Sequence, residues 1–219
     1  IAAHELKTPL TSLLGHAELL QRRNRRTGDL ESRNRRSVDT IVNQARRLNL
    51  MIQTLLDISR LEQGRLSIER RPVDLSALTR QVVDEMQPML DQHSLKYEPS
   101  AEPLLMLGDA LRLEQVLHNI VSNAVKYTPQ GGVIEIATER QGGDVCMIVR
   151  DHGIGVPAAA LPRLFDQYFR AENASRQFVS GLGLGLYVVK QIVSMHGGSV
   201  AVESHEGQGS TFTVCLPAI

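Results

Sequence analysis

Residues 113–129 read LEQVLHNIVSNAVKYTP, and the spacing of their side chains predicts an amphipathic helix. The apolar positions that would face a core are Leu113, Val116, Leu117, Ile120 and Ala124. Asn119, Asn123 and Lys126 are spaced i, i+4 and i+7, so they share one narrow stripe beside that apolar face. An asparagine carbonyl is a suitable oxygen ligand for magnesium, and a lysine ammonium is a point-charge partner for phosphate. The stripe indicates either part of a nucleotide site or an ordinary solvated polar face.

A second candidate feature follows the predicted strand at Val145–Arg150. This strand ends at Asp151, and the turn after it contains Gly153 and Gly155. An aspartate at a strand end can accept a hydrogen bond from an adenine amino group, and glycines let the backbone come close to a flat base. The alternative is a plain turn, because Asp-x-Gly is common in turns.

A third feature is a glycine-rich run directly before a predicted helix at Gly185–His196. The run reads Gly181-Leu182-Gly183-Leu184-Gly185-Leu186. Free N–H groups and the helix dipole at such an N-terminus suit a phosphate. A dinucleotide fingerprint is disfavoured, because it needs G-x-G-x-x-G after a strand and the third glycine here is one place early. The Walker pattern fails as well, since no Gly-Lys-Ser/Thr follows.

The remainder of residues 74–219 predicts an α+β domain. Asp74 can cap a helix that runs to about Gln92, and a further helical pattern covers Asp109–Tyr127. The predicted strands are Val133–Glu139, Val145–Arg150, Ser199–Ser204 and Ser210–Leu216. Short glycine-bearing loops join these strands in pairs, which implies antiparallel hairpins. We therefore expect helices packed over a mainly antiparallel sheet.

Residues 1–68 predict a helical hairpin, and residues 69–73 a linker. The apolar stripe of the first helix contains Leu6, Leu10, Leu13, Ala17 and Leu20, and the seam of the second contains Val38, Ile41, Ala45, Leu48, Ile52 and Leu55. Two helices joined by a short loop pack antiparallel. One hairpin cannot bury two wide apolar stripes by itself, so we expect a homodimer that forms a four-helix bundle.

These pieces resemble, in sequence order, the boxes of the histidine-kinase ATP-binding domain, within the wider family that includes gyrase B, Hsp90 and MutL. The resemblance lies in Asn119–Pro129 for the N box, Asp151–Gly155 for the G1 box, Leu164–Arg170 for the F box, Gly181–Leu186 for the G2 box and Gly207–Phe212 for the last glycine box. Five such signals in the family order are far more specific than any one alone. The resemblance implies a Bergerat-type α/β-sandwich that binds ATP.

The resemblance also implies the role of each residue toward ATP and Mg²⁺. Asn123 would coordinate magnesium, with Asn119 beside it, while Lys126 and Arg170 would face the phosphates. The other positions that it implies near the nucleotide are Tyr127, Asp151, Gly153, Gly155, Tyr168, Gly181, Leu182, Gly183, Leu184, Gly185 and Thr211. Among these, Asp151 would read the adenine. Residues 165–180 would form a mobile lid over the nucleotide.

The chain opens with Ile1-Ala-Ala-His4-Glu5-Leu6-Lys7-Thr8-Pro9-Leu10, which resembles the H box of the histidine-kinase phosphotransfer domain. A histidine offers a neutral nitrogen nucleophile at cellular pH, and Glu5 could accept the proton of the other ring nitrogen. The resemblance implies autophosphorylation of His4, followed by transfer to an aspartate of a response-regulator receiver domain. Glu5 and Thr8 also resemble the E-x-x-T element that positions water to dephosphorylate that partner.

Composition sets limits on partners and location. Lysine plus arginine is 24 and aspartate plus glutamate is 24, so no net charge favours nucleic acid or an anionic membrane. Apolar runs are far shorter than the roughly 20 residues of a membrane span. We expect a cytoplasmic fragment that lacks an upstream sensor or membrane region and carries no signal peptide. Cys146 and Cys215 are too few for a disulfide framework, and we expect small buried side chains in a reducing compartment.

Three other functions fit parts of this pattern. A dimeric scaffold without catalysis would be supported by a broken box, whereas His4, Glu5, Asn123 and Asp151 are all present. A protein-serine kinase of the same ATPase family would not need the histidine motif. A gyrase-like or chaperone ATPase needs an N-box glutamate that activates water, and Asn119 stands in that place.

Overall fold

The computed structural model describes residues 10–20, 31–176 and 182–219, and it divides into two compact units. One unit comprises residues 1–65 with 180–182, and the other comprises residues 66–179 with 183–219. Each unit is described by itself.

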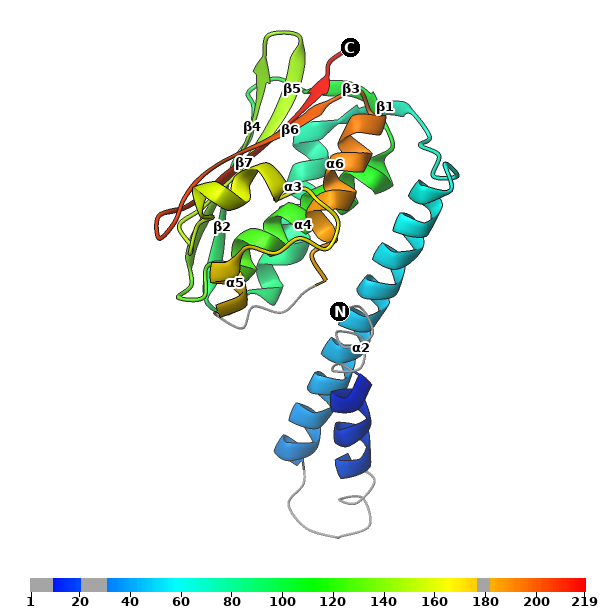
Figure 1. Ribbon diagram of the computed structural model, residues 1–219, viewed down its shortest axis with the longest axis vertical. Coiled ribbons are helices and arrows are strands. Elements are labelled where there is room, and N and C mark those ends of the chain that lie inside the picture. The colour runs from blue at the N-terminus through cyan, green and yellow to red at the C-terminus, as the bar shows by residue number, and fades with distance from the viewer. Residues whose placement is uncertain (1–9, 21–30, 177–181) are drawn as a thin grey trace. The chain divides into compact units, whose positions relative to one another are not determined.

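The described part of the first unit is helical, as the hairpin prediction requires. Residues 10–20 form one helix, and α2 (Glu31–Glu62) forms the other (Figure 1). The Arg65 N–H donates to the Arg60 carbonyl over 2.8 Å, and Gly64 has a φ of 63°, which is the arrangement that ends a helix at a left-handed residue. In the part of the chain that the structure describes, no helix is both long enough and apolar enough to cross a membrane.

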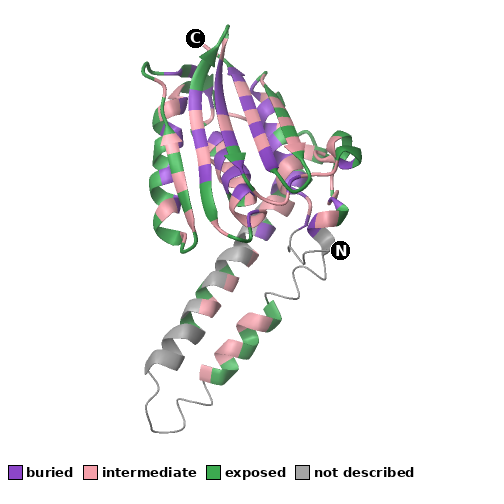
Figure 2. Cartoon of the chain, turned by 90° about the vertical axis from the view of Figure 1, so that its left-hand side faces the viewer, coloured by how far each residue is buried: buried purple, intermediate pink, exposed green. Residues whose placement is uncertain are grey.

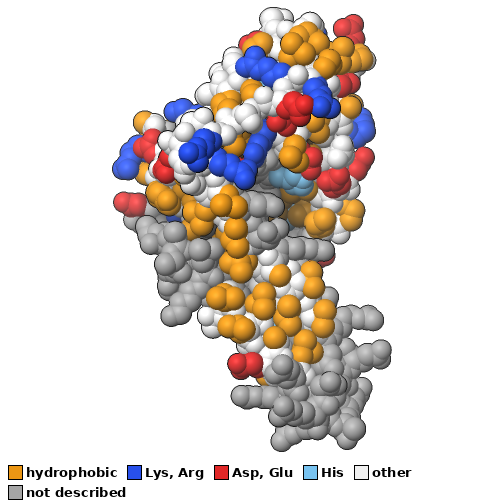
Figure 3. All heavy atoms as spheres, turned by 90° about the vertical axis from the view of Figure 1, so that its right-hand side faces the viewer, with side chains coloured by type: hydrophobic (Ala, Val, Ile, Leu, Met, Phe, Trp, Pro, Cys, Tyr) orange, Lys and Arg blue, Asp and Glu red, His pale blue; other side chains and the backbone are white. Residues whose placement is uncertain are grey.

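The apolar seam predicted for α2 divides between two helix faces. Its partly buried members are Ile41, Leu48 and Leu55, and its exposed members are Val38, Ala45 and Ile52. The exposed members repeat every seven residues, and Val42 and Leu56 extend the same exposed row. Figure 3 shows hydrophobic side chains gathered on the described part of the hairpin. A heptad-spaced apolar row that one chain leaves exposed is typical of a helix that packs against another helix.

The second unit is an α+β domain, which confirms the predicted class. Its helices are α3 (Leu75–Met86), α4 (Ala110–Lys126), α5 (Glu172–Arg176) and α6 (Gly185–Met195), with 3-10 turns η1 (Gln87–Met89) and η2 (Ala158–Arg163). Its strands are β1 (Arg71–Asp74), β2 (His93–Glu98), β3 (Leu105–Gly108), β4 (Gly132–Gln141), β5 (Asp144–Asp151), β6 (Ser199–His205) and β7 (Gly209–Pro217).

The main sheet has the strand order β2-β4-β5-β7-β6, and only the β2–β4 pair is parallel. Both predicted hairpins, β4–β5 and β6–β7, are present. Strands β1 and β3 form a separate antiparallel pair. The mainly antiparallel sheet with helices on one side agrees with the expectation (Figure 1).

The core lies between α3, α4 and α6 and the covered face of the sheet. The predicted core residues of α4 are all nearly inaccessible: Leu113, Val116, Leu117, Ile120 and Ala124. On β4, Ile134 and Ile136 are buried while Glu135 between them is not, so successive side chains point to opposite faces of the sheet. Figure 2 shows this alternation of buried and more exposed positions along the strands. The core therefore holds α4, and with it the polar stripe, against the sheet.

Several short elements differ from the expectation. The helix after Asp74 ends at Met86 rather than near Gln92, because Pro88 cannot continue the hydrogen-bond ladder, and β2 begins at His93. Residues 71–73, expected in the linker, belong to β1 and pair with β3. These strands have four to six residues, so pairing with distant partners decides their conformation more than local propensity does.

Cys146 and Cys215 form a disulfide, which corrects the expectation of two free buried side chains. They stand directly opposite each other in the β5–β7 register, with their Cα atoms 4.1 Å apart. Opposite residues of an antiparallel pair bring their side chains together. The two residues are 69 positions apart, and the sequence did not predict that β5 would pair with β7.

Candidate nucleotide-binding site

Helix α4 presents the asparagine–lysine stripe at the edge of the buried core. Asp109 caps the helix, because its carboxylate accepts the Arg112 N–H over 3.2 Å. Asn119 Nδ2 donates to the Gln115 carbonyl over 2.9 Å. Its Oδ1 atom lies at the first turn of α6, since a Cβ atom added to Gly185 would be only 2.9 Å away. The predicted glycine run and the predicted N-box helix are therefore in contact.

The basic groups predicted for the phosphates gather around Tyr127. Lys126 Nζ lies 4.7 Å from the centre of the Tyr127 ring and donates to its hydroxyl over 3.2 Å. Burial raises the pKa of Tyr127, and the nearby positive charge of Arg170 acts in the opposite direction. Arg170 of the F box thus lies near Tyr127 at the end of α4, and its role toward a phosphate stays a prediction. An ammonium and a guanidinium at one place suit a polyphosphate.

Asp151 is a buried carboxyl at the end of β5, with 4% of its surface exposed. Burial raises the pKa of Asp151, while the backbone N–H groups of Gly153 and Ser210 lower it. The Gly153 N–H donates to Oδ1 over 2.9 Å. A carboxylate has about four acceptor positions, so capacity remains for the amino group of a ligand. This position suits the recognition of a base rather than a surface turn.

The glycines after Asp151 allow close packing of main chain on main chain. A Cβ atom at Gly153 would lie 2.0 Å from the Tyr127 carbonyl, and the Ile154 N–H donates to that same carbonyl over 3.0 Å. Gly155 has a φ of 61°, and a Cβ atom there would lie 2.0 Å from the His205 carbonyl. We expected these glycines to make room for a base. In the structure Gly153 brings the turn after β5 against the end of α4, and Gly155 brings it against the end of β6. Their role toward a base stays a prediction.

The glycine run before α6 contains two buried leucines, and within the described chain the helix that follows has no side-chain cap at its N-terminus. Leu182 and Leu184 are buried, so their side chains hold the run in place. Gly183 has a φ of 70° and packs against the Phe169 carbonyl, which would be 2.6 Å from an added Cβ atom. Among the described residues, no side chain caps the N-terminus of α6. Its free N–H groups can therefore hold a phosphate.

Two residues that the sequence analysis did not single out support this site. Asn173 of α5 donates from Nδ2 to the Gly155 carbonyl over 2.9 Å, and the Ser210 N–H bonds to Asp151. Ser210 is also the β7 partner of Asp151, and the predicted Thr211 follows it, opposite Arg150. Ser210 lies inside the last glycine box, but its contact with Asp151 depends on the pairing of β5 with β7. The contact of Asn173 with Gly155 likewise depends on the tertiary structure.

The remaining predicted positions stand as follows. Tyr168 is partly exposed in the segment before α5 and has a φ of 62°, which is uncommon for a residue other than glycine. His4, Glu5, Thr8 and Gly181 lie outside the described residues.

The donor set of the second unit fits a magnesium nucleotide. The amides of Asn119 and Asn123 supply hard oxygen donors, and Lys126 and Arg170 supply positive charge. Asp151 lies next to the Tyr127–Gly153 contact, since its carboxylate accepts the Gly153 N–H. All these groups come from the N, G1 and F boxes predicted from the sequence.

Two family models match this chain. The model described as histidine kinase-, DNA gyrase B-, and HSP90-like ATPase matches residues 108–219. The His Kinase A (phospho-acceptor) domain matches residues 1–64. One match lies within each of the two predicted domains.

Curated relatives and solved structures agree with these matches. The circadian input-output histidine kinase CikA of Synechococcus elongatus is 35% identical over 98% of this chain, and the sensor-like histidine kinase SenX3 of Mycobacterium tuberculosis is 33% identical over 99%. The chain spans 29% and 52% of the length of these two relatives. The structure of full-length ShkA in complex with AMPPNP has 30% identity and a TM-score of 0.69, covering 98% of this chain and 44% of that one. The Acinetobacter baumannii histidine kinase AdeS shares the fold, with 23% identity, a TM-score of 0.70, and coverage of 98% and 97%.

Proposed function

Since this chain belongs to the sensor histidine kinases, as a catalytic core that joins a phospho-acceptor domain to an ATPase domain, we propose that it phosphorylates His4 with ATP. The phosphoryl group then passes to an aspartate of a response-regulator receiver domain. The observation that carries this proposal is the match to both domain families in one chain. Contacts between the boxes support it, because the G1 turn and Arg170 lie at Tyr127 and Gly185 lies against Asn119.

The nucleotide roles follow from the chemistry of the site. Asp151 accepts the hydrogen bond of the adenine amino group, and Lys126 and Arg170 face the phosphates. Asn123 and Asn119 hold Mg²⁺, which when bound neutralises phosphate charge. The uncapped N-terminus of α6 adds backbone N–H groups toward the same phosphates.

The transfer itself places little covalent chemistry on the ATPase domain. A neutral nitrogen of His4 forms a bond to the γ-phosphorus while the bond between that phosphorus and the β–γ bridging oxygen breaks, and ADP leaves. The ring loses the proton from its other nitrogen, and Glu5 accepts it. Positioning and charge stabilisation by the site supply most of the acceleration.

The proposed partners follow from the same family membership. A solved structure of the histidine kinase ThkA in complex with the response regulator protein TrrA has this fold, with 23% identity and a TM-score of 0.68. We infer a receiver domain as the phosphate acceptor, with Glu5 and Thr8 also serving its dephosphorylation. The exposed heptad row of α2 supports a homodimer through the hairpin, and we place this fragment in the cytoplasm.

The experiment that tests the function is incubation with γ-labelled ATP and magnesium. We compare the wild-type chain with His4→Gln and with the control His16→Gln, which changes the next histidine along the chain. An acid-labile, base-stable label on wild type and control, and none on His4→Gln, is the expected result. Label retained on His4→Gln would overturn the assignment of the acceptor. ATP binding without any label on wild type would favour a scaffold instead.

A further inference from the structure

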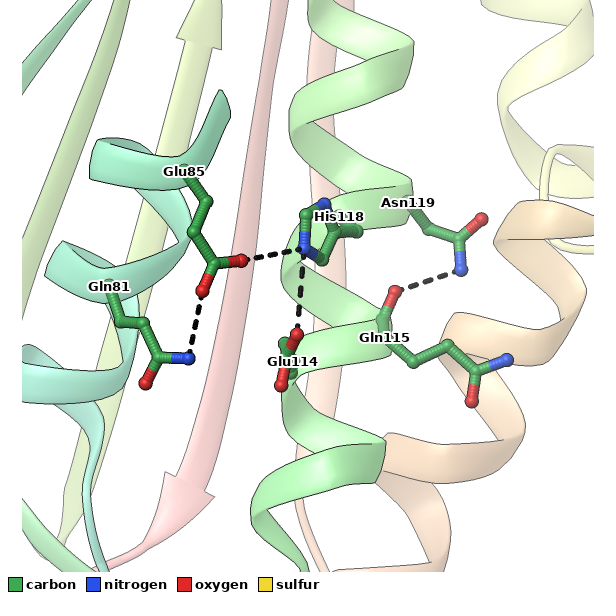
Figure 4. Close-up of polar contacts among 6 residues, drawn as sticks. All are labelled: Gln81, Glu85, Glu114, Gln115, His118 and Asn119. Atoms are coloured by element: carbon green, nitrogen blue, oxygen red, sulfur yellow. Dashed lines mark hydrogen bonds and ion pairs between the residues drawn. The ribbon is translucent and has the colours of Figure 1, made fainter. Parts of the chain in front are cut away.

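Three metal-ligating side chains converge between α3 and α4, apart from the nucleotide stripe. Glu85 comes from α3, and Glu114 and His118 are spaced i, i+4 on α4. Figure 4 shows these three side chains facing one another, while Gln115 and Asn119 lie on the other side of α4, toward α6. The cluster therefore uses a different face of α4 from the one that the proposed kinase function uses.

The distances within the cluster are close to those of a metal site. His118 Nε2 lies 3.7 Å from a Glu114 carboxylate oxygen and 4.0 Å from a Glu85 oxygen. One ligand atom from each of the three residues lies within 4.8 Å of the other two. In a tetrahedral zinc site with bonds of about 2.0–2.2 Å, the ligand atoms are about 3.3 Å apart. Small side-chain adjustments would thus bring all three atoms to coordination distance.

The surroundings hold the ligands in a suitable orientation. Gln81, one turn before Glu85, donates from Nε2 to Glu85 Oε1 over 3.0 Å, and Oε2 is the oxygen nearest to His118. Such hydrogen bonds to ligand carboxylates are typical outer-shell contacts of metal sites. The three side chains are 30% to 48% exposed, so an ion can enter from solvent and water can complete its coordination.

We propose that Glu85, Glu114 and His118 form a zinc-binding site that links α3 to α4. One imidazole and two carboxylates suit Zn²⁺, whereas Mg²⁺ and Ca²⁺ prefer oxygen ligands alone. Because Zn²⁺ would bind the folded arrangement, it stabilises the domain. It also restrains α4, the helix that carries Asn119 and Asn123. Without a metal, the same cluster is a histidine that lies near two glutamates.

The test is calorimetric titration of the metal-free, tag-free chain with ZnCl₂, without nucleotide, at a pH of about 7.5, where an ordinary imidazole is neutral. The variants are His118→Gln and Gln81→Ala. The matched control is His205→Gln, which removes an exposed histidine on β6 that lies outside the cluster. Thermal unfolding with and without ZnCl₂ serves as the second readout, and the metal-free transitions establish that each variant folds.

The wild type and His205→Gln should each bind one ion per chain, and ZnCl₂ should raise their unfolding temperature. Loss of the outer-shell contact in Gln81→Ala should weaken binding about tenfold, and loss of the imidazole in His118→Gln should weaken it further. Absence of binding to the wild type, or equal binding to His118→Gln, would overturn the proposal and leave the cluster as polar side chains that meet between two helices. Neither result depends on kinase activity, so failure here leaves the proposed function standing.

Discussion

At the scale of single residues, Asp151 shows how function and stability oppose each other. The side chain is buried at the end of β5, and two backbone N–H groups only partly offset the loss of hydration. A buried carboxylate lowers the stability of the fold, but it suits a ligand that supplies a hydrogen-bond donor. Two predictions follow from this one side chain.

The first concerns binding. Asp151→Asn replaces one acceptor oxygen by an amide that donates, so it should weaken ATP binding roughly 10- to 100-fold, the range expected for a hydrogen bond to a charged group. Calorimetric titration with ATP measures this change. The matched control is Asp144→Asn, at the other end of the same strand, which should bind as the wild type does. Equal affinities of the two variants would remove Asp151 from the nucleotide site.

The second concerns pH. Burial raises the pKa of Asp151 above its ordinary value of 3.8, so the ionised carboxyl destabilises the fold. This cost is absent at pH values below 3.8, where the carboxyl is protonated in both the folded and the unfolded chain. It is complete at pH values above the pKa of the folded state. Asp151→Asn should therefore be more stable than the wild type at a pH of about 7, and this advantage should shrink as the pH falls toward about 4. Urea unfolding at several pH values measures the difference; a difference that does not change with pH would contradict the argument.

At the scale of elements, the site depends on how the ends of α4 and β5 are held. Gly153→Ala would push a methyl group into the Tyr127 carbonyl, 2.0 Å from the added carbon. We expect a loss of about 1–3 kcal/mol in the free energy of unfolding, the usual cost of overpacking. Gly143→Ala is the matched control, since nothing lies within 4 Å of its added carbon. Urea unfolding of both variants tests this, and equal stabilities would mean that the close approach is not required.

The start of α4 supports a further prediction. Asp109 accepts the Arg112 N–H over 3.2 Å and the Glu69 N–H over 3.1 Å, so it joins the helix to the chain before β1. Asp109→Ala should lower the free energy of unfolding by about 1–2 kcal/mol, as expected for a lost N-cap. Asp84→Ala removes an exposed carboxylate in the last turn of α3 and should have little effect. A loss no greater than that of the control would show that Asp109 does not act as a cap.

At the scale of the whole molecule, the exposed row on α2 is the surface through which we propose that two hairpins associate. Ile52 is 44% exposed in one chain and lies in the heptad row with Val38 and Ala45. Ile52→Glu places a charge where two hairpins would meet, so it should shift the dimer toward monomer while ATP binding remains. Sedimentation over a range of concentrations measures this. Met89→Glu, at a 73% exposed position of the ATPase domain, is the control. A wild-type monomer, or an unchanged Ile52→Glu dimer, would contradict the bundle.

Local pattern predicted the larger elements and most of the candidate site. The helix at Asp109–Tyr127 and four strands appear within one to two residues of the expected bounds, because their apolar periods are long and regular. The site residues of the second domain could be named because each box is a short contiguous run. Four-residue strands such as β1 and β3 escaped prediction, since pairing rather than propensity stabilises them.

The sequence by itself determined the class of the domain, the identity of its boxes and the polar stripe of α4, because helical and strand periods and glycine positions are local properties. Tertiary structure alone decided that Arg170 comes to Tyr127, that Cys146 meets Cys215, and that Glu85 joins His118. Each of these pairs combines elements that are distant along the chain. Their meeting depends on strand order and on helix packing over the sheet, which no local pattern encodes.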